Sequence, residues 1–131
     1  MNYCLKGCFA VGITLILGCA PFSPESPEDV VGGRALEQAN ALMLGEYELA
    51  LTYMTPTYQS SPRAADYQRN RAGSGGWKEV DLKWVKCDQE YVSCDVRLLI
   101  WTLRPPAVTV PISIPLDDKW IKVGGQWYQY D

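Results

Sequence analysis

The side chains of this chain that could act as acids or bases are carboxylates and phenols, because its 131 residues include no histidine. Histidine is the commonest general base and the central member of a Ser-His-Asp triad, so these familiar catalytic sites are excluded. A carboxylate beside a phenol in an apolar pocket can still transfer protons. The candidates for such a pair are Asp66, Asp81, Asp95, Tyr47, Tyr53 and Tyr67. We prefer the alternative, in which the strand aspartates face solvent and the tyrosine hydroxyls lie at the rim of the core, and we assign no catalytic residue.

Six residues separate Cys87 from Cys94, between two strand-like segments. A hairpin would place them opposite each other on neighbouring strands, and in an oxidising compartment they would form a disulfide. Closing so short a loop stabilises a fold by roughly 2–3 kcal/mol. The alternative is a metal or redox pair, but the spacing is not Cys-x-x-Cys and no histidine can assist. We therefore predict a structural disulfide, no metal and no cofactor.

Cys19 follows a segment with the features of a secretion signal. Lys6 precedes an apolar run of about nine residues, Phe9 to Leu17, which is too short to span a bilayer. The run ends in Ile16-Leu17-Gly18-Cys19, which resembles the lipobox of bacterial lipoproteins. That resemblance implies cleavage after Gly18 and a diacylglycerol, with further acylation such as palmitate, on Cys19. The alternative is an ordinary signal peptide followed by a free cysteine.

This interpretation divides the chain into a signal peptide (1–18), a lipidated cysteine with a proline-rich tether (19–27) and one domain (28–131). Removing the eighteen signal residues from 131 leaves 113, enough for a single core. The spacer from Ala20 to Pro27 reaches about 25 Å at ~3.1 Å per residue, so we expect the domain close to the membrane. Ala20, in place of aspartate, resembles the sorting signal for the outer membrane, with the domain facing the periplasm.

The charge of the exported chain argues against two classes of partner. Loss of Lys6 leaves 11 basic and 15 acidic residues, a net charge of −4, with the two signs interspersed. Such a domain has no basic block to neutralise phosphates, so we expect no nucleic-acid partner. It also gains little attraction from anionic lipids, and the acyl chains alone would hold it on the membrane.

The first half of the domain carries helix signals. Ser26-Pro27 followed by two acids predicts a helix start, and Gly45 predicts its end. A second helix is predicted over 46–54 and a third over 56–71, followed by a flexible break at 72–76. The buried stripe expected on the first helix is Val30, Leu36, Ala39, Leu42 and Met43.

The second half alternates apolar and polar residues, as strands do. Val80, Leu82 and Trp84 are predicted to share one face of the first strand, and the alternate residues of 92–100 one face of the second. A turn is predicted at 104–106, an edge or irregular strand follows over 108–115, and a final hairpin turns at Gly124-Gly125 between 119–123 and 126–130. Helices followed by an antiparallel sheet of about four to five strands make an α+β fold.

The order of these elements resembles the NTF2-like, cystatin-like α+β fold, in which N-terminal helices pack into a curved antiparallel sheet. The residues that carry the resemblance are Gly45-Glu46-Tyr47-Glu48-Leu49-Ala50, Met54-Thr55-Pro56, the strands around Trp84 and Cys94, and Trp120-Ile121-Lys122-Val123-Gly124-Gly125-Gln126-Trp127-Tyr128. The fold hosts isomerases, dehydratases and binding proteins, so the resemblance does not by itself imply an activity.

All five tryptophans fall in the sheet half of the chain. Trp101 shares one face of its strand with Leu99 and Leu103, because residues two apart point the same way. Val96, Leu98 and Ile100 lie on the other face. One face cannot hold all five tryptophans, so some fill the core under the helices or lie on the outer face, where aromatic residues favour partner contacts. The possible ligand or partner contacts are Tyr47, Tyr53, Trp84, Trp101, Trp120 and Trp127.

These features favour a non-catalytic envelope lipoprotein, attached to the membrane through Cys19, whose domain binds an envelope protein or a small apolar ligand. Two alternatives stay open. One is a lipid-anchored enzyme of isomerase or dehydratase type with an aspartate and a tyrosine in the concave pocket. The other is a structural subunit of an envelope assembly.

Overall fold

The computed structural model describes residues 25–103 and 110–131. The helical segments come first: α1 (Pro27–Met43), α2 (Tyr47–Leu51), α3 (Pro56–Gln59), the 3₁₀ turn η1 (Pro62–Asp66), α4 (Tyr67–Arg71) and the 3₁₀ turn η2 (Ala72–Gly76). The strands follow: β1 (Trp77–Cys87), β2 (Ser93–Thr102), β3 (Ile112–Val123) and β4 (Gln126–Tyr130). The predicted change from helices to strands at Gly76 is therefore confirmed.

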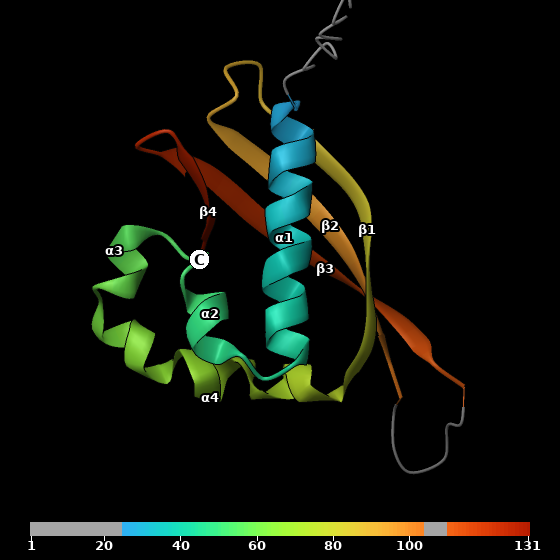
Figure 1. Ribbon diagram of the computed structural model, residues 1–131. Coiled ribbons are helices and arrows are strands. Elements are labelled where there is room, and N and C mark those ends of the chain that lie inside the picture. The colour runs from blue at the N-terminus through green and yellow to red at the C-terminus, as the bar shows by residue number, and fades with distance from the viewer. Residues whose placement is uncertain (1–24, 104–109) are drawn as a thin grey trace, which may run out of the picture.

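The strands form one antiparallel four-stranded sheet in the order β1-β2-β3-β4. The sheet is curved, and α1 lies across its concave side, while the shorter helical segments gather at the C-terminal end of α1 and beside β4 (Figure 1). One core cluster lies between α1 and the sheet, and a second joins the end of α1 to α2, α3 and α4. This arrangement confirms the predicted α+β fold.

Both ends of α1 follow the sequence signals. The Ser26 hydroxyl accepts a hydrogen bond of 3.1 Å from the Asp29 backbone N–H, and proline occupies the first helical position. Gly45 ends the helix with a φ of 76°, and the following Glu46 N–H donates to the Ala41 carbonyl at 2.8 Å. A residue with positive φ at this point is the usual helix stop, and it turns the chain into α2.

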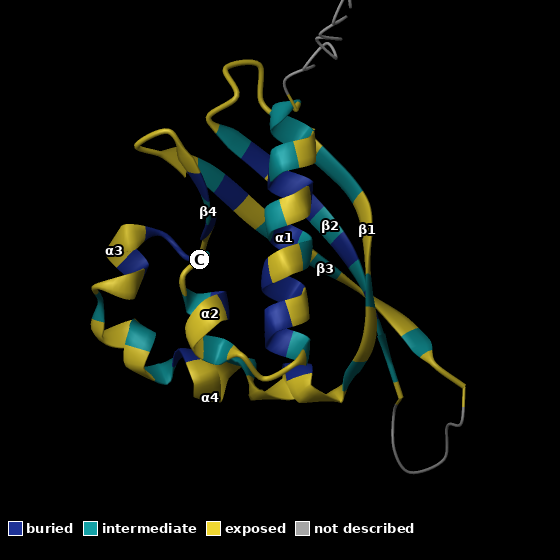
Figure 2. Cartoon of the chain, in the orientation of Figure 1, coloured by how far each residue is buried: buried dark blue, intermediate teal, exposed yellow. Residues whose placement is uncertain are grey.

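The buried side of α1 differs in part from the predicted stripe. Its buried residues are Val31, Gly32, Ala35, Gln38, Ala39, Ala41 and Leu42, whereas Val30, Leu36 and Met43 are half-buried (Figure 2). The reason is the close approach of α1 to β1: a Cβ on Gly32 would lie 2.7 Å from Leu82 Cδ2. Small residues therefore face the sheet, and larger apolar residues lie at the sides of the contact.

The third predicted helix and the flexible break are also different in the structure. Residues 56–71 form three short segments, α3, η1 and α4, because Pro62 interrupts the helical hydrogen bonding. Residues 72–76 form the ordered turn η2, whose buried Ser74 Oγ lies 2.9 Å from the Leu42 carbonyl and 2.7 Å from the Arg71 carbonyl. A serine hydroxyl that bonds the end of α1 holds the turn in place, and glycine content alone could not indicate this.

The predicted alternation of β1 fails at one point. The register with β2 shifts between Leu82 and Trp84, where Lys83 is an extra residue, and Trp84 lies opposite Arg97. Such a bulge moves the following side chains to the other face of the sheet. Trp84 therefore lies on the convex face of the sheet rather than with Val80 and Leu82 on the concave face.

The strands predicted over 108–115 and 119–123 are, within the described residues, one strand, β3 (Ile112–Val123). Its neighbour β4 pairs only with residues 119–123, so β3 is an edge at Pro115, where a missing N–H is tolerated. Gly124 and Gly125 join β3 to β4 with φ values of 58° and 81°, the positive angles of a two-residue hairpin turn, as predicted.

The remaining sequence predictions lie outside the described residues. They are the signal peptide, the lipobox with Cys19, most of the tether, the turn at 104–106 and the strand start at Val108. Within residues 25–103 and 110–131, none of the helices has the length and apolar character needed to span a membrane.

Candidate functional site

The concave side of the sheet is filled by side chains. Trp120 is fully buried beneath α1, and Met54 and Tyr67 are buried where the short helices meet its end, with exposed fractions of 0%, 0% and 1%. Trp127, at 5%, completes the core beside α1. The predicted contacts Trp120 and Trp127 are thus core residues, and ligand binding at them would need other side chains to move.

A chain of polar side chains crosses this apolar interior. Gln38 of α1 donates a hydrogen bond of 2.6 Å from Nε2 to Gln129 Oε1 on β4, and Gln129 Nε2 donates to Asp118 Oδ1 at 2.9 Å. The same Gln38 nitrogen lies 3.3 Å from the Tyr67 hydroxyl. Both glutamines are buried, so their hydrogen bonds offset the cost of removing them from water.

Asp118 and Tyr67 are two titratable groups at the ends of this polar chain. Burial raises the pKa of Asp118, although the positive charge of Arg71 and the hydrogen bond from Gln129 oppose the shift. Burial also raises the pKa of Tyr67, again against the effect of Arg71. A carboxyl and a phenol can act together in proton transfer, but here Gln129 and Gln38 stand between Asp118 and Tyr67 in the hydrogen-bonded chain.

The aspartates proposed from the sequence lie elsewhere, on the surface. Asp66 pairs with Arg69, Asp95 lies 3.5 Å from Lys119 Nζ, and Asp81 accepts a hydrogen bond of 2.8 Å from the Trp101 indole N–H. Among the described residues, none of the three aspartates forms a hydrogen bond with the Tyr67 hydroxyl, although Asp66 precedes Tyr67 in the chain. Sequence reasoning missed Asp118 because Asp117 and Asp118 are adjacent, and only the register of β3 decides which of them turns inward.

The convex face of the sheet carries Trp84 and Trp101, both half-buried. The Trp84 ring lies near two cations, with Lys86 Nζ 4.7 Å and Arg97 Cζ 5.1 Å from its centroid. Arg97 also binds Asp117 through two hydrogen bonds of 2.6 Å. These aromatic side chains are thus engaged by neighbouring residues, which allows them to lie at a surface in contact with water.

Tyr53 joins α1 to the end of β4. Its hydroxyl donates to Glu37 at 3.0 Å, and the Arg34 guanidinium lies 4.8 Å from the centre of its ring. Arg34 Nε also donates to the Trp127 carbonyl at 2.8 Å. Partial burial and the Glu37 carboxylate raise the pKa of Tyr53. These contacts give Tyr53 a role in holding α1 against β4.

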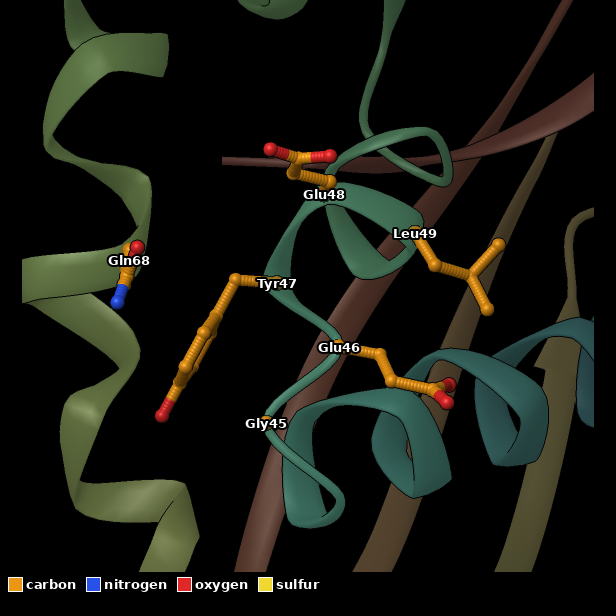
Figure 3. Close-up of a pocket in the computed structure, with 6 residues that line it drawn as sticks. All are labelled: Gly45, Glu46, Tyr47, Glu48, Leu49 and Gln68. Carbon is orange, nitrogen blue, oxygen red and sulfur yellow. The ribbon is translucent and has the colours of Figure 1, made fainter.

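A hollow of about 560 Å³ opens at the connection of α1 to α2. Figure 3 shows the Tyr47 side chain directed toward α4, and the Leu49 side chain on the opposite side of α2, directed away from α4. Leu49 is 48% exposed and the neighbouring Leu44 is 69% exposed, so apolar surface is open to solvent here. The residues that line the hollow are Gly45, Glu46, Tyr47, Glu48, Leu49 and Gln68.

The charge at this hollow is negative. Glu46 and Glu48 are exposed, and neither forms an ion pair with a described residue. Apolar side chains with carboxylates beside them suit a partner segment that offers an apolar residue and a lysine or arginine. Tyr47 is the one predicted contact residue that lies at this position. Among the described residues no cluster of three or more acids and cysteines is arranged to hold a metal ion.

No protein-family model matches the sequence, and no curated protein sequence matches it. Solved structures do match. A candidate NTF2-like transpeptidase from Campylobacter jejuni superposes with a TM-score of 0.57 at 12% identity, covering 72% of this chain and 92% of the other. A protein with a SEC-C motif from Psychrobacter arcticus gives 0.62 at 12% identity, covering 79% of this chain and 60% of the other.

A candidate dehydratase of the NTF2-like family from Streptomyces avermitilis superposes with a TM-score of 0.54 at 13% identity, covering 82% of this chain and 93% of the other. At such low identity these matches describe the backbone and not the chemistry of the site. The sheet order, the helix across the concave face and the structural neighbours together show that this chain has an NTF2-like α+β fold.

Proposed function

We propose that this protein is a lipid-anchored envelope protein whose domain binds a protein partner without catalysing a reaction. The observation that carries the proposal is the filled concave face. Trp120, Met54 and Tyr67 fill the interior beneath α1 and the short helices, so an apolar ligand there would have to displace buried side chains. A partner protein needs no such space, because it can bind at the surface.

The binding site in this proposal is the acidic hollow at Gly45–Leu49. Leu44 and Leu49 provide the exposed apolar surface, and Glu46 and Glu48 provide charge that steers a basic partner and fixes its orientation. The partner segment is expected to carry an apolar side chain next to a lysine or arginine. Tyr47 adds an amphipathic ring of the kind enriched at protein interfaces.

The anchor in this proposal is Cys19. Its motivation is the lipobox resemblance, and Ala20 favours the outer membrane, with the domain in the periplasm. Metabolic labelling with a palmitate analogue, followed by membrane fractionation, tests both points. Label on the native chain and none on Cys19→Ala, in outer-membrane fractions, is expected. Recovery of the labelled chain with the inner membrane would contradict the assignment to the outer membrane.

A photocrosslinking experiment tests the binding site. A photoreactive phenylalanine derivative replaces Leu49 in the hollow, or Glu79, which is exposed on β1, as the matched control. In cells that make the protein natively, we expect a discrete adduct from position 49 and none from position 79. The double change Glu46→Lys with Glu48→Lys should abolish the adduct, whereas Glu79→Lys should leave it. Equal adducts from both positions would argue against the hollow.

A second candidate function is an isomerase or dehydratase, and the position of Asp118 beneath the helices is the observation that favours it. Asp118 lies in one hydrogen-bonded chain with Gln129, Gln38 and Tyr67, and its raised pKa suits a general acid. Cells that carry only the Asp118→Asn protein separate the two functions. Full complementation of a deletion by that variant would exclude catalysis by Asp118, whereas a null phenotype with normal protein levels would favour it.

A further inference from the structure

We infer that one end of the domain is a membrane-contacting tip, formed by Tyr91 and Val92, that enters the headgroup region of a lipid bilayer. The inference rests on the proposed acyl anchor at Cys19. It goes further by stating which face of the domain meets the membrane and through which side chains.

The tip lies at the same end of the molecule as the start of α1 (Figure 1). α1 runs antiparallel to β1, because Gly32 near the start of the helix lies against Val85 near the end of the strand. The turn 88–92 that follows β1 is consequently beside the first turn of α1. The chain that leads back to Cys19 therefore leaves the domain next to this turn.

The side chains at this end are apolar and open to solvent. Tyr91 is 47% exposed, Val92 48% and Val123 40%. The Val92 carbonyl accepts a hydrogen bond of 2.9 Å from the Lys122 N–H, so the turn between β1 and β2 is joined to the end of β3. Tyr91 and Val92 thus form an apolar pair on one turn, which Figure 2 shows as exposed, whereas Val123 lines a separate hollow beside α3.

The turn that presents Tyr91 is held rigidly. The disulfide between Cys87 and Cys94 closes it, and Asp88 Oδ1 accepts a hydrogen bond of 2.9 Å from the Val92 N–H. These backbone hydrogen bonds lower the pKa of Asp88, which keeps the carboxylate charged and bound to the turn. Tyr91 has a φ of 52°, an angle that a bulky residue rarely adopts. An exposed tyrosine fixed in this conformation suggests a contact surface rather than a loop free to fold its ring away.

A bilayer fits this surface because of distance and chemistry. The seven residues between Cys19 and Pro27 reach about 22 Å at ~3.1 Å per residue, so the start of α1 stays near the headgroups. Tyrosine is enriched at membrane interfaces, where its ring meets lipid and its hydroxyl meets water. Asp88 and Glu90 on the same turn disfavour anionic lipids, so a zwitterionic lipid such as phosphatidylethanolamine is the expected contact.

The same geometry separates the tip from the acidic hollow. α1 has 17 residues and therefore spans about 25 Å, with its start at the tip and its end at Gly45. If Tyr91 and Val92 contact the membrane, the hollow points away from it. The hollow is then accessible to soluble envelope proteins or to proteins of an opposing membrane.

Lipid photocrosslinking tests the tip. The full lipidated protein is reconstituted into phosphatidylethanolamine vesicles that contain a diazirine-bearing phospholipid, irradiated and mapped by mass spectrometry. The test variant Tyr91→Asn with Val92→Thr removes the apolar surface while keeping a residue that tolerates positive φ. The matched control is Val110→Thr with Ile114→Thr, two exposed apolar positions at the other end of the sheet.

We expect lipid adducts on the peptide that contains Tyr91 and Val92, a several-fold loss of these adducts in the test variant, and no change in the control. Adducts confined to other peptides of a chain acylated on Cys19 would overturn the tip and leave the anchor standing. A Cys19 without acyl chains would overturn the proposed anchor, and the inference with it. Mass spectrometry of the intact chain distinguishes these two failures.

Discussion

Gln38 on α1 and Gln129 on β4 are joined by a hydrogen bond of 2.6 Å, although 91 residues separate them in the sequence. The bond continues to Asp118 on β3, so a single polar chain connects the helix layer to the last two strands. Because both glutamines are buried, neither can exchange this partner for water.

Replacing Gln38 by leucine should destabilise the fold by about 1–3 kcal/mol, because Gln129 Oε1 would be left buried without its donor. Denaturant unfolding measures the change. The control is Gln126→Leu, since Gln126 lies on the same strand as Gln129 but is exposed. Equal effects of the two replacements would show that the buried bond contributes nothing to stability.

Asp118→Asn should stabilise the protein at pH 7, with the advantage shrinking as the pH falls. Burial raises the pKa of Asp118, so the folded state binds its proton more tightly than the unfolded state does. The protonated carboxyl therefore stabilises the folded state. This contribution is fully present below the ordinary pKa of 3.8 and is lost as the pH rises through the raised pKa. Asparagine keeps an acceptor for Gln129 without the charge.

The neighbouring Asp117→Asn should behave in the opposite way. The Arg97 guanidinium lowers the pKa of Asp117, so its charged form favours folding above the ordinary pKa and this contribution is lost as the pH falls through the lowered pKa. Thermal unfolding of both variants and the native chain from pH 7 to pH 3 gives the comparison. The same sign for both variants at pH 7 would contradict the assignment of Asp118 as the inward-facing residue.

Two adjacent glycines of α1 should respond differently to alanine. Gly33→Ala is expected to stabilise the fold by about 0.5–1 kcal/mol, because alanine favours helix and nothing lies within 4 Å of the new methyl. Gly32→Ala should lose that gain, since its methyl would lie 2.7 Å from Leu82 Cδ2 and 3.3 Å from Val85 Cγ2. Chemical denaturation of the two variants measures this difference. An equal gain at both positions would show that α1 does not pack closely on β1.

Reduction of the disulfide between Cys87 and Cys94 should lower the free energy of unfolding by roughly 2–3 kcal/mol. Without the cross-link the unfolded chain has more conformations, so folding costs more conformational entropy. Urea unfolding with and without a reductant measures the loss, and a Cys87→Ser, Cys94→Ser double variant that is insensitive to reductant serves as control. Two free thiols in the purified exported protein would contradict the disulfide.

Local signals in the sequence determined the elements of the fold. The Ser26 cap, the glycine stop at Gly45, the paired glycines at Gly124-Gly125 and the spacing of Cys87 and Cys94 each predict a local structure that the chain adopts. These predictions succeed because a cap, a positive φ or a short loop depends on a few neighbouring residues.

Tertiary contacts decided which side chains face the interior. The extra residue at Lys83 moves Trp84 to the convex face, the register of β3 turns Asp118 inward beside Asp117, and Leu82 against Gly32 sets which side of α1 is buried. A shift of one residue reverses the face of every side chain after it, and no local pattern shows that shift. The sequence by itself determined the α+β class and the disulfide, and the anchor stays a prediction. The filled core, the inward Asp118 and the exposed hollow followed from how the elements pack.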